Sequence, residues 1–112
     1  MIIRSYKTEN PKENPHKVDV RPLYNDPSAQ VSHITLQPGE SLKPHKTPVD
    51  VVFYILEGTP TVLVGEEREA IGPDHLVESP AHIVHCLSNE GSGQARILVI
   101  KAPRPAMATR VL

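Results

Sequence analysis

The chain contains no tryptophan, one phenylalanine and one cysteine among its 112 residues. The single Cys86 cannot form a disulfide within the chain, which agrees with a reducing compartment. No apolar run reaches the length that crosses a bilayer, and the first residues lack the basic start and apolar stretch of a signal peptide. These absences predict a cytoplasmic protein that does not use a membrane as a partner.

The chain also lacks an excess of charge of one sign. Twelve Lys and Arg residues are interspersed with thirteen Asp and Glu residues, for a net charge of −1. Because no basic stripe is present to neutralise phosphates, we do not expect nucleic acid as a partner. The length fits one domain, whose folding would bury roughly two-thirds of the surface of the unfolded chain.

Proline, by contrast, is abundant, with twelve residues. This density excludes long helices, whereas short strands separated by corners tolerate it. Runs rich in β-branched residues recur between turn signals about every eight to twelve positions, as in antiparallel sandwiches and barrels. The sequence therefore predicts an all-β fold. The expected strands cover residues 31–36, 49–56, 61–64, 68–71, 76–78, 85–88 and 94–101.

The expected organisation is a leader, a barrel and a tail. Residues 1–27 form a polar leader with a candidate strand at residues 2–6 that would pair with a partner subunit. Residues 28–102 form the barrel, and residues 103–112 form a loosely held tail. His16 lies in the leader, and we expect its side chain to be solvated.

Two motifs carry the chemistry. The first begins at the Pro38-Gly39 corner, continues through His45, and ends with a strand that closes at Glu57-Gly58. The second runs from Pro80 through His85 to Asn89. Two histidines at matching points of two strand segments indicate a shared site in the barrel interior.

These motifs resemble those of small single-domain cupins. The frame G-x5-H-x-H-x3-4-E-x6-G is matched from Gly39 to Gly58, and G-x5-P-x-G-x2-H-x3-N is matched at Pro80, His85 and Asn89. Asp74 and His82 stand where the second motif has its two glycines. The resemblance covers residues 28–102 and implies an antiparallel double-stranded β-helix, the jelly-roll barrel of cupins.

The resemblance also implies a candidate cofactor, a divalent zinc, nickel, iron or manganese ion. Carried over by position, His45 and His85 are metal ligands, while Thr47 and Val51 replace the second histidine and the glutamate. Two neutral imidazoles alone make a weak site, because specific sites use three or four protein ligands. A third ligand is left open among these residues: His33, His82, Glu78 and Asp50.

Strand alternation predicts what surrounds the histidines. Val51, Phe53 and Ile55 share the inward face of one strand, and Thr47 adds a hydroxyl, so these four residues are the predicted small-molecule contacts. Apolar residues on the opposite face of that strand predict a buried second surface, hence a homodimer. Cys86 follows His85 directly and should face away from the site.

The sequence leaves the activity open between two functional classes. In the first, the protein is a cupin that binds a small molecule, a divalent metal or both, without an assigned activity. In the alternative, it is a metal-dependent enzyme of oxygenase or isomerase type that acts on a small organic substrate. The missing glutamate disfavours the enzyme, because it removes a charge-compensating ligand and an obvious base, and no catalytic residue is assigned. A barrel with a vestigial cavity is a third, plainer outcome.

Overall fold

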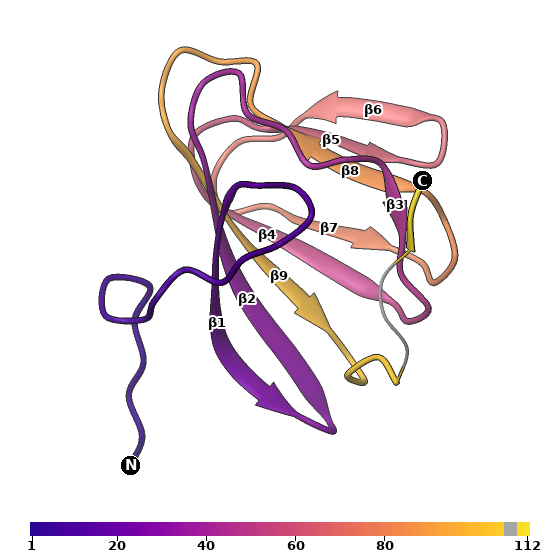
Figure 1. The fold of residues 1–112 in the computed structure, drawn as a ribbon. Helices are drawn as coiled ribbons and strands as arrows, with labels where there is room; N and C mark the ends of the chain where they lie inside the picture. Colours follow the sequence, from indigo (N-terminus) through magenta and orange to yellow (C-terminus); the bar gives the residue numbers. More distant parts are fainter. Residues whose placement is uncertain (107–109) are drawn as a thin grey trace.

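The structure, a computed structural model, describes residues 1–106 and 110–112 as two antiparallel sheets (Figure 1). The order of strands is β1-β2-β9-β4-β7 in one sheet, called sheet A, and β10-β3-β8-β5-β6 in the other, called sheet B. In this part of the chain there is no helix long and apolar enough to span a bilayer. The all-β class and the double-stranded β-helix predicted from the sequence are confirmed.

The strands of sheet A are β1 (Asp19–Asp26), β2 (Ala29–Leu36), β4 (Val51–Glu57), β7 (Leu76–Ser79) and β9 (Ala95–Lys101). Those of sheet B are β3 (His45–Lys46), β5 (Thr61–Val64), β6 (Glu67–Ala70), β8 (His85–Ser88) and β10 (Arg110–Val111). Most of them coincide with the strands predicted from the alternation of side chains.

The strand β1 lies inside the segment predicted as the leader. It pairs with β2 from Asp19 opposite Thr35 to Asp26 opposite Ala29, and the register shifts between Pro22 and Tyr24. Proline cannot donate a ladder hydrogen bond, so the bulge and the edge position of β1 are where a strand tolerates it. Residues 2–6 form no strand within the chain. Of the predicted tail, residues 107–109 lie outside the described residues, and β10 pairs with β3.

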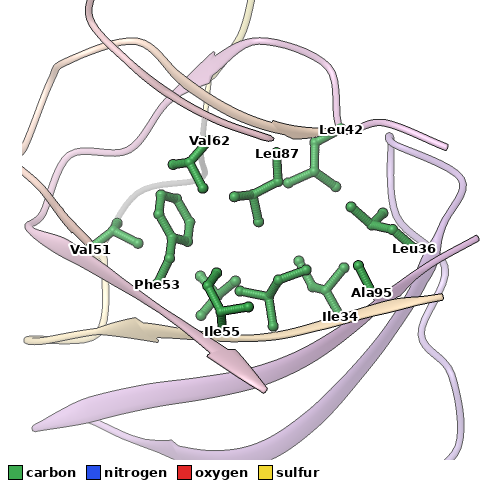
Figure 2. Close-up of a cluster of buried hydrophobic side chains, with 11 residues drawn as sticks. Ile34, Leu36, Leu42, Val51, Phe53, Ile55, Val62, Leu87 and Ala95 are labelled. Atoms are coloured by element: carbon green, nitrogen blue, oxygen red, sulfur yellow. The ribbon is translucent and has the colours of Figure 1, made fainter. Parts of the chain in front are cut away.

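The hydrophobic core fills the space between the sheets (Figure 2). Phe53 and Ile55 from β4 meet Leu87 from β8 and Ile97 from β9, and each of these side chains is at most 1% exposed. Inward and outward residues alternate along β4 and β9, as the pattern of their residues predicts. Full burial of one such side chain stabilises the fold by about 1.5–3 kcal/mol.

Asn89, the last residue of the second motif, has a structural task. Its buried amide nitrogen donates to the carbonyl oxygens of Leu36 (2.9 Å) and Gly93 (2.8 Å), and its Oδ1 accepts from Gly91 N–H. Its backbone carbonyl also accepts from Gly39 N–H at 2.9 Å. Asn89 thereby ties the Pro38-Gly39 corner to the loop after β8.

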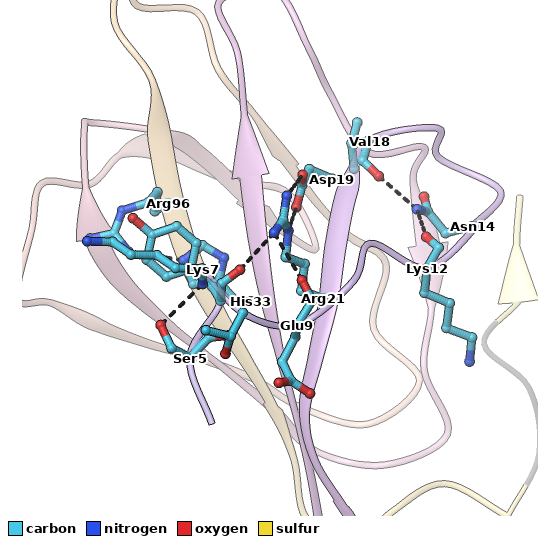
Figure 3. A network of polar contacts seen from close by, with 12 residues as sticks. Ser5, Lys7, Glu9, Lys12, Asn14, Val18, Asp19, Arg21, His33 and Arg96 are labelled. Atoms are coloured by element: carbon cyan, nitrogen blue, oxygen red, sulfur yellow. Dashed lines mark hydrogen bonds and ion pairs between the residues drawn. The ribbon is translucent and has the colours of Figure 1, made fainter. Parts of the chain in front are cut away.

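The first part of the leader packs against the outer face of sheet A (Figure 3). Arg21, paired with Asp19, donates to the backbone carbonyls of Tyr6 (2.8 Å) and Glu9 (3.0 Å). The Tyr6 ring stacks on His33 with centroids 4.2 Å apart. This stack covers His33, which is 1% exposed although it lies on the face of β2 turned away from the core.

His33 is held as a neutral imidazole. Its Nε2 lies 3.1 Å from a guanidinium nitrogen of Arg96, which can only donate, so Nε2 accepts. Its Nδ1 is buried without a hydrogen-bond partner in the described part of the chain. Burial, followed by the charge of Arg96, lowers the pKa of His33 to about 4. Protonation would therefore place a second positive charge beside Arg96, between sheet A and the leader, and Asp19 would offset it only in part.

We predict that replacing Gly58 destabilises the barrel. Gly58 has a φ of +78°, and a Cβ there would lie 2.7 Å from the Gln94 carbonyl oxygen and 2.9 Å from Ala95 Cα. Gly58→Ala should lower the free energy of unfolding by about 2 kcal/mol or more. Urea unfolding measures this, with Gly72→Ala as the control because its Cβ would meet no atom within 4 Å. Equal stability of the two variants would contradict the tight corner.

We also predict that acid weakens the fold through His33. Unfolded His33 titrates near 6.5 and folded His33 near 4, so the unfolded state binds more protons between these values. The free energy of unfolding should fall as pH drops from about 6.5 to 4, by up to about 1.4 kcal/mol per pH unit for this residue. Urea unfolding of His33→Phe should show a shallower dependence, whereas His75→Ala, changed at an exposed position, should keep the full slope. An unchanged slope in His33→Phe would refute this.

Candidate functional site

The structure brings His45 and His85 together inside the barrel. They are directly opposite each other where β3 pairs with β8. Their rings meet edge to face with centroids 4.4 Å apart, and their residues are 6% and 2% exposed. Opposite residues of an antiparallel pair project from the same face, so the pairing itself creates the two-imidazole site.

The orientation of His85 is fixed on both sides of its ring. Ser79 Oγ lies 2.7 Å from its Nδ1, and Thr47 Oγ1 lies 3.3 Å from its Nε2. The Phe53 ring packs edge-on against the imidazole with a centroid distance of 5.2 Å. Both ring nitrogens therefore have hydroxyl partners. Thr47, which the sequence predicted as a contact for a small molecule, has its hydroxyl next to His85 instead.

His45 leaves one nitrogen available. Its Nδ1 lies 2.7 Å from the Lys43 carbonyl oxygen, which can only accept, so Nδ1 carries the proton. In the neutral imidazole, Nε2 then bears a lone pair. That lone pair can accept a hydrogen bond or bind a metal ion.

His16 joins the site, so the expectation that its side chain is solvated was wrong. Asn14 closes the leader turn by donating to the carbonyls of Lys12 (3.0 Å) and Val18 (2.8 Å). The turn brings His16 Nδ1 within 2.8 Å of Lys43 N–H, and its ring within 4.8 Å of the His45 ring. Because Nδ1 accepts this bond, the proton of neutral His16 is on Nε2. Asn14-Pro15 marks a turn in the sequence, but nothing there indicates where the turn docks.

A cavity of about 360 Å³ opens beside the histidines. Apolar side chains form part of its wall, and polar side chains, several of them from β2 and the leader, form the rest. The apolar residues include Val20, Ile34, Leu42, Phe53, Val99 and Val111, and the polar ones include Asn14, Gln30 and Ser32. The charged lining residues are Lys12, Glu13 and Lys101.

The other predicted contacts lie beside this wall. Val51 and Ile55 flank Phe53 on the inward face of β4 and belong to the core, with 1% and 0% exposure. Cys86 is half-buried, and its Sγ lies 3.0 Å from the Leu42 carbonyl oxygen. Burial raises the pKa of its thiol, which disfavours a nucleophilic role.

The candidates for a third metal ligand lie elsewhere. Asp50, Glu78 and His82 are exposed, and Asp50 accepts a hydrogen bond from Ala81 N–H at 2.9 Å. His33 is on the outer face of sheet A, beneath Tyr6. Within residues 1–106 and 110–112, no three His, Cys, Asp or Glu side chains are grouped so that they could hold a metal ion.

The site histidines are disposed to be neutral. Burial is the main cause that lowers the pKa of His85 and of His16 to about 4, and the charge that a protonated His45 would carry adds to it in both. Burial also lowers the pKa of His45, against the opposing effect of its bond to the Lys43 carbonyl. The imidazoles therefore act near pH 7 as hydrogen-bonding groups without charge.

Lys101 is the charged residue of the cavity that comes from the barrel itself. It lies opposite Val51 where β4 pairs with β9, and shares the inward face of β9 with Val99. Lys101 has an interaction partner within the chain. Burial lowers its pKa, and its charge in turn contributes to the lowered pKa values of the three site histidines.

Comparison with known proteins agrees with this architecture. The family model described as the cupin domain matches residues 32–101. The crystal structure of TT1209 from Thermus thermophilus is 34% identical, with a TM-score of 0.81, and the match covers 94% of this chain and 100% of that one. No curated protein is similar enough in sequence to count as a match.

Two further crystal structures share the fold at lower identity. An RmlC-like cupin family protein from Methanocaldococcus jannaschii is 24% identical, with a TM-score of 0.76 and 94% of each chain covered. The polyketide cyclase RemF from Streptomyces resistomycificus is 16% identical, with a TM-score of 0.85, covering 100% of this chain and 85% of that one. Together with the family model, which spans more than half of the sequence, these findings show that the chain belongs to the cupin family.

Proposed function

We propose that this cupin binds a small organic molecule in the cavity beside His45 and His85. The observation that carries the proposal is the convergence of neutral, buried imidazoles and an apolar wall on one cavity of about 360 Å³. This size is at the lower end for ligand pockets, which are mostly apolar with a few placed polar groups. The cavity thus favours a ligand of roughly one ring.

The proposed contacts divide by chemistry. His45 Nε2 accepts a hydrogen bond from the ligand, and His16 Nε2–H donates one, as their bonds to the Lys43 backbone dictate. Phe53 packs against the apolar part of the ligand, supported from within the core by Val51 and Ile55. Thr47 keeps the His85 imidazole in place.

The metal-dependent alternative is supported less well by these side chains. His45 and His85 would be the ligands, but both nitrogens of His85 have hydroxyl partners, and Thr47 and Val51 supply no further imidazole or carboxylate. Tight sites for zinc, nickel, iron or manganese need three or four such ligands. The donor set does not fit a resident metal, so we assign no oxygenase or isomerase step. A cytoplasmic location stays a prediction.

We also propose that the protein is a homodimer in which a second copy covers the part of the outer face of sheet A around Tyr54, Leu76 and Leu98. Across β4, β7 and β9 an apolar cluster of outward residues is in register, with Tyr54 opposite both Leu76 and Leu98, while Glu78 and Arg96 are the charged residues of this face. Leu76 is 55% exposed within the single chain. An apolar face of this kind on a sheet is characteristic of a buried interface.

Binding should depend on both histidines while the barrel stays folded. We expect His45→Ala and His85→Ala each to abolish the binding of small aromatic fragments, because each removes a polar group of the cavity. Removing His85 should also cost about 1–3 kcal/mol of stability, since it leaves the Ser79 and Thr47 hydroxyls unpaired. Ligand-observed NMR with a library of single-ring fragments measures binding.

The control for this experiment is His75→Ala, because His75 is exposed and lies outside the cavity. Its amide spectrum and its fragment binding should equal those of the unchanged protein. If the fragments that bind the unchanged protein still bind both site variants, the cavity is not their site. If both variants unfold, these histidines are structural.

The dimer should dissociate when charge is placed on the outer face of sheet A. We expect Leu76→Lys to shift the protein from dimer to monomer in sedimentation velocity, because the lysine would bury an unpaired charge in the interface. Ile83→Lys is the matched control, since Ile83 is also exposed (39%) but lies between β7 and β8. A monomeric unchanged protein, or a dimeric Leu76→Lys variant, would refute the proposed interface.

A further inference from the structure

At the position that matches the glutamate ligand of cupin motifs, this chain has no carboxylate, and a lysine lies next to that position. Val51 occupies that position, and the residue opposite it across the β4–β9 pair is Lys101. Opposite residues of an antiparallel pair project from the same face with Cβ atoms about 4.5–5.5 Å apart. The barrel therefore places an ammonium group beside the point where a metal-binding cupin places a carboxylate.

The ammonium group acts on the site itself. The charge of Lys101 contributes to the lowered pKa of His16, His45 and His85, so it lies within electrostatic reach of all three rings. Lys101 is also half-buried, where water screens its charge less than at an exposed position. A divalent cation at these imidazoles would be repelled, and an anion would be attracted.

Other residues of the cavity supply further hydrogen-bond donors and a second positive charge besides Lys101. Lys12 lines the entrance from the leader, and the Nε2–H of His16 is a neutral donor. Gln30 lies opposite Lys101 across the β2–β9 pair and lines the same cavity. Among the charged side chains that line the cavity in the described part of the chain, the two lysines face one acid, Glu13.

We propose that the ligand of this cavity is a small organic carboxylate with an apolar body, and that Lys101 binds the carboxylate. This inference rests on the proposed small-molecule function and names its substrate class. The apolar body would lie against Phe53 and Val99, on the inward faces of β4 and β9. Lys101 already has an interaction partner within the chain, so the carboxylate would bind alongside that partner.

The test compares acids with their neutral amides of the same shape. We would titrate the full chain with benzoate and benzamide, phenylacetate and phenylacetamide, and hexanoate and hexanamide, following backbone amide shifts by NMR. The acid of a binding pair should bind about tenfold or more tightly than its amide, since a charge-assisted hydrogen bond is about twice as strong as a neutral one. Shifts should concentrate at the residues around the cavity.

Three lysine variants test whether Lys101 causes the preference for acids over amides. Lys101→Met keeps the length of the side chain and removes its charge, so the acid and the amide of each pair should then bind with equal affinity. Lys101→Arg keeps the charge and should retain the preference. Lys46→Met is the matched control, because Lys46 follows His45 on β3, is exposed, and does not line the cavity.

The outcomes separate the two proposals. Amides that bind as tightly as their acids, or a preference that survives Lys101→Met, would overturn the carboxylate inference and leave small-molecule binding intact. Failure of every acid and every amide to bind would overturn both. If Lys101→Met does not fold, the comparison of Lys101→Arg with the unchanged protein still decides, because an acid preference lost while the charge is kept would contradict the role of Lys101.

Discussion

The pairing of β3 with β8 is the constraint on which the site depends. The strand β3 has only two residues, His45 and Lys46, and His45 is the one that pairs with His85. Such a short strand makes few backbone hydrogen bonds to its neighbours. Its position is fixed by neighbours, since β10 pairs with its other edge and Asn89 ties down the Pro38-Gly39 corner that precedes it. The two imidazoles face each other because these backbone restraints leave β3 one register.

What the sequence predicts well is what local periodicity and fixed spacing determine. The inward residues of β4 and β9 follow from alternation, and the spacing from Gly39 to Gly58 carries the corner, the histidine and the strand in one frame. The two matching motifs predict that His45 and His85 share a site, although the two-residue strand β3 that begins at His45 was not among the expected strands. These features depend on contacts along one strand or between adjacent strands.

What the sequence does not predict depends on long-range docking. His16 reaches the site because Asn14 closes a turn and the backbone of Lys43 receives the imidazole, and neither event leaves a periodic signal. Long-range contacts also decide that His33 lies outside the site. Alternation places His33 on one face of β2, but only the register with β9 and the docked Tyr6 decide that this face is the outer one. Lys101 becomes a residue of the cavity through its inward position on β9, beside Val99 and opposite Gln30 of β2.

The leader contributes to two surfaces of the molecule. Tyr6 packs on the outside of sheet A, while Lys12 and His16 form part of the cavity wall. Both segments precede residue 32, where the shared domain begins. A lineage of such proteins can therefore alter its cavity by changing residues that precede both histidine motifs. Relatives grouped by their common domain would then share an architecture without sharing a ligand, and the leader would be the place to look for the difference.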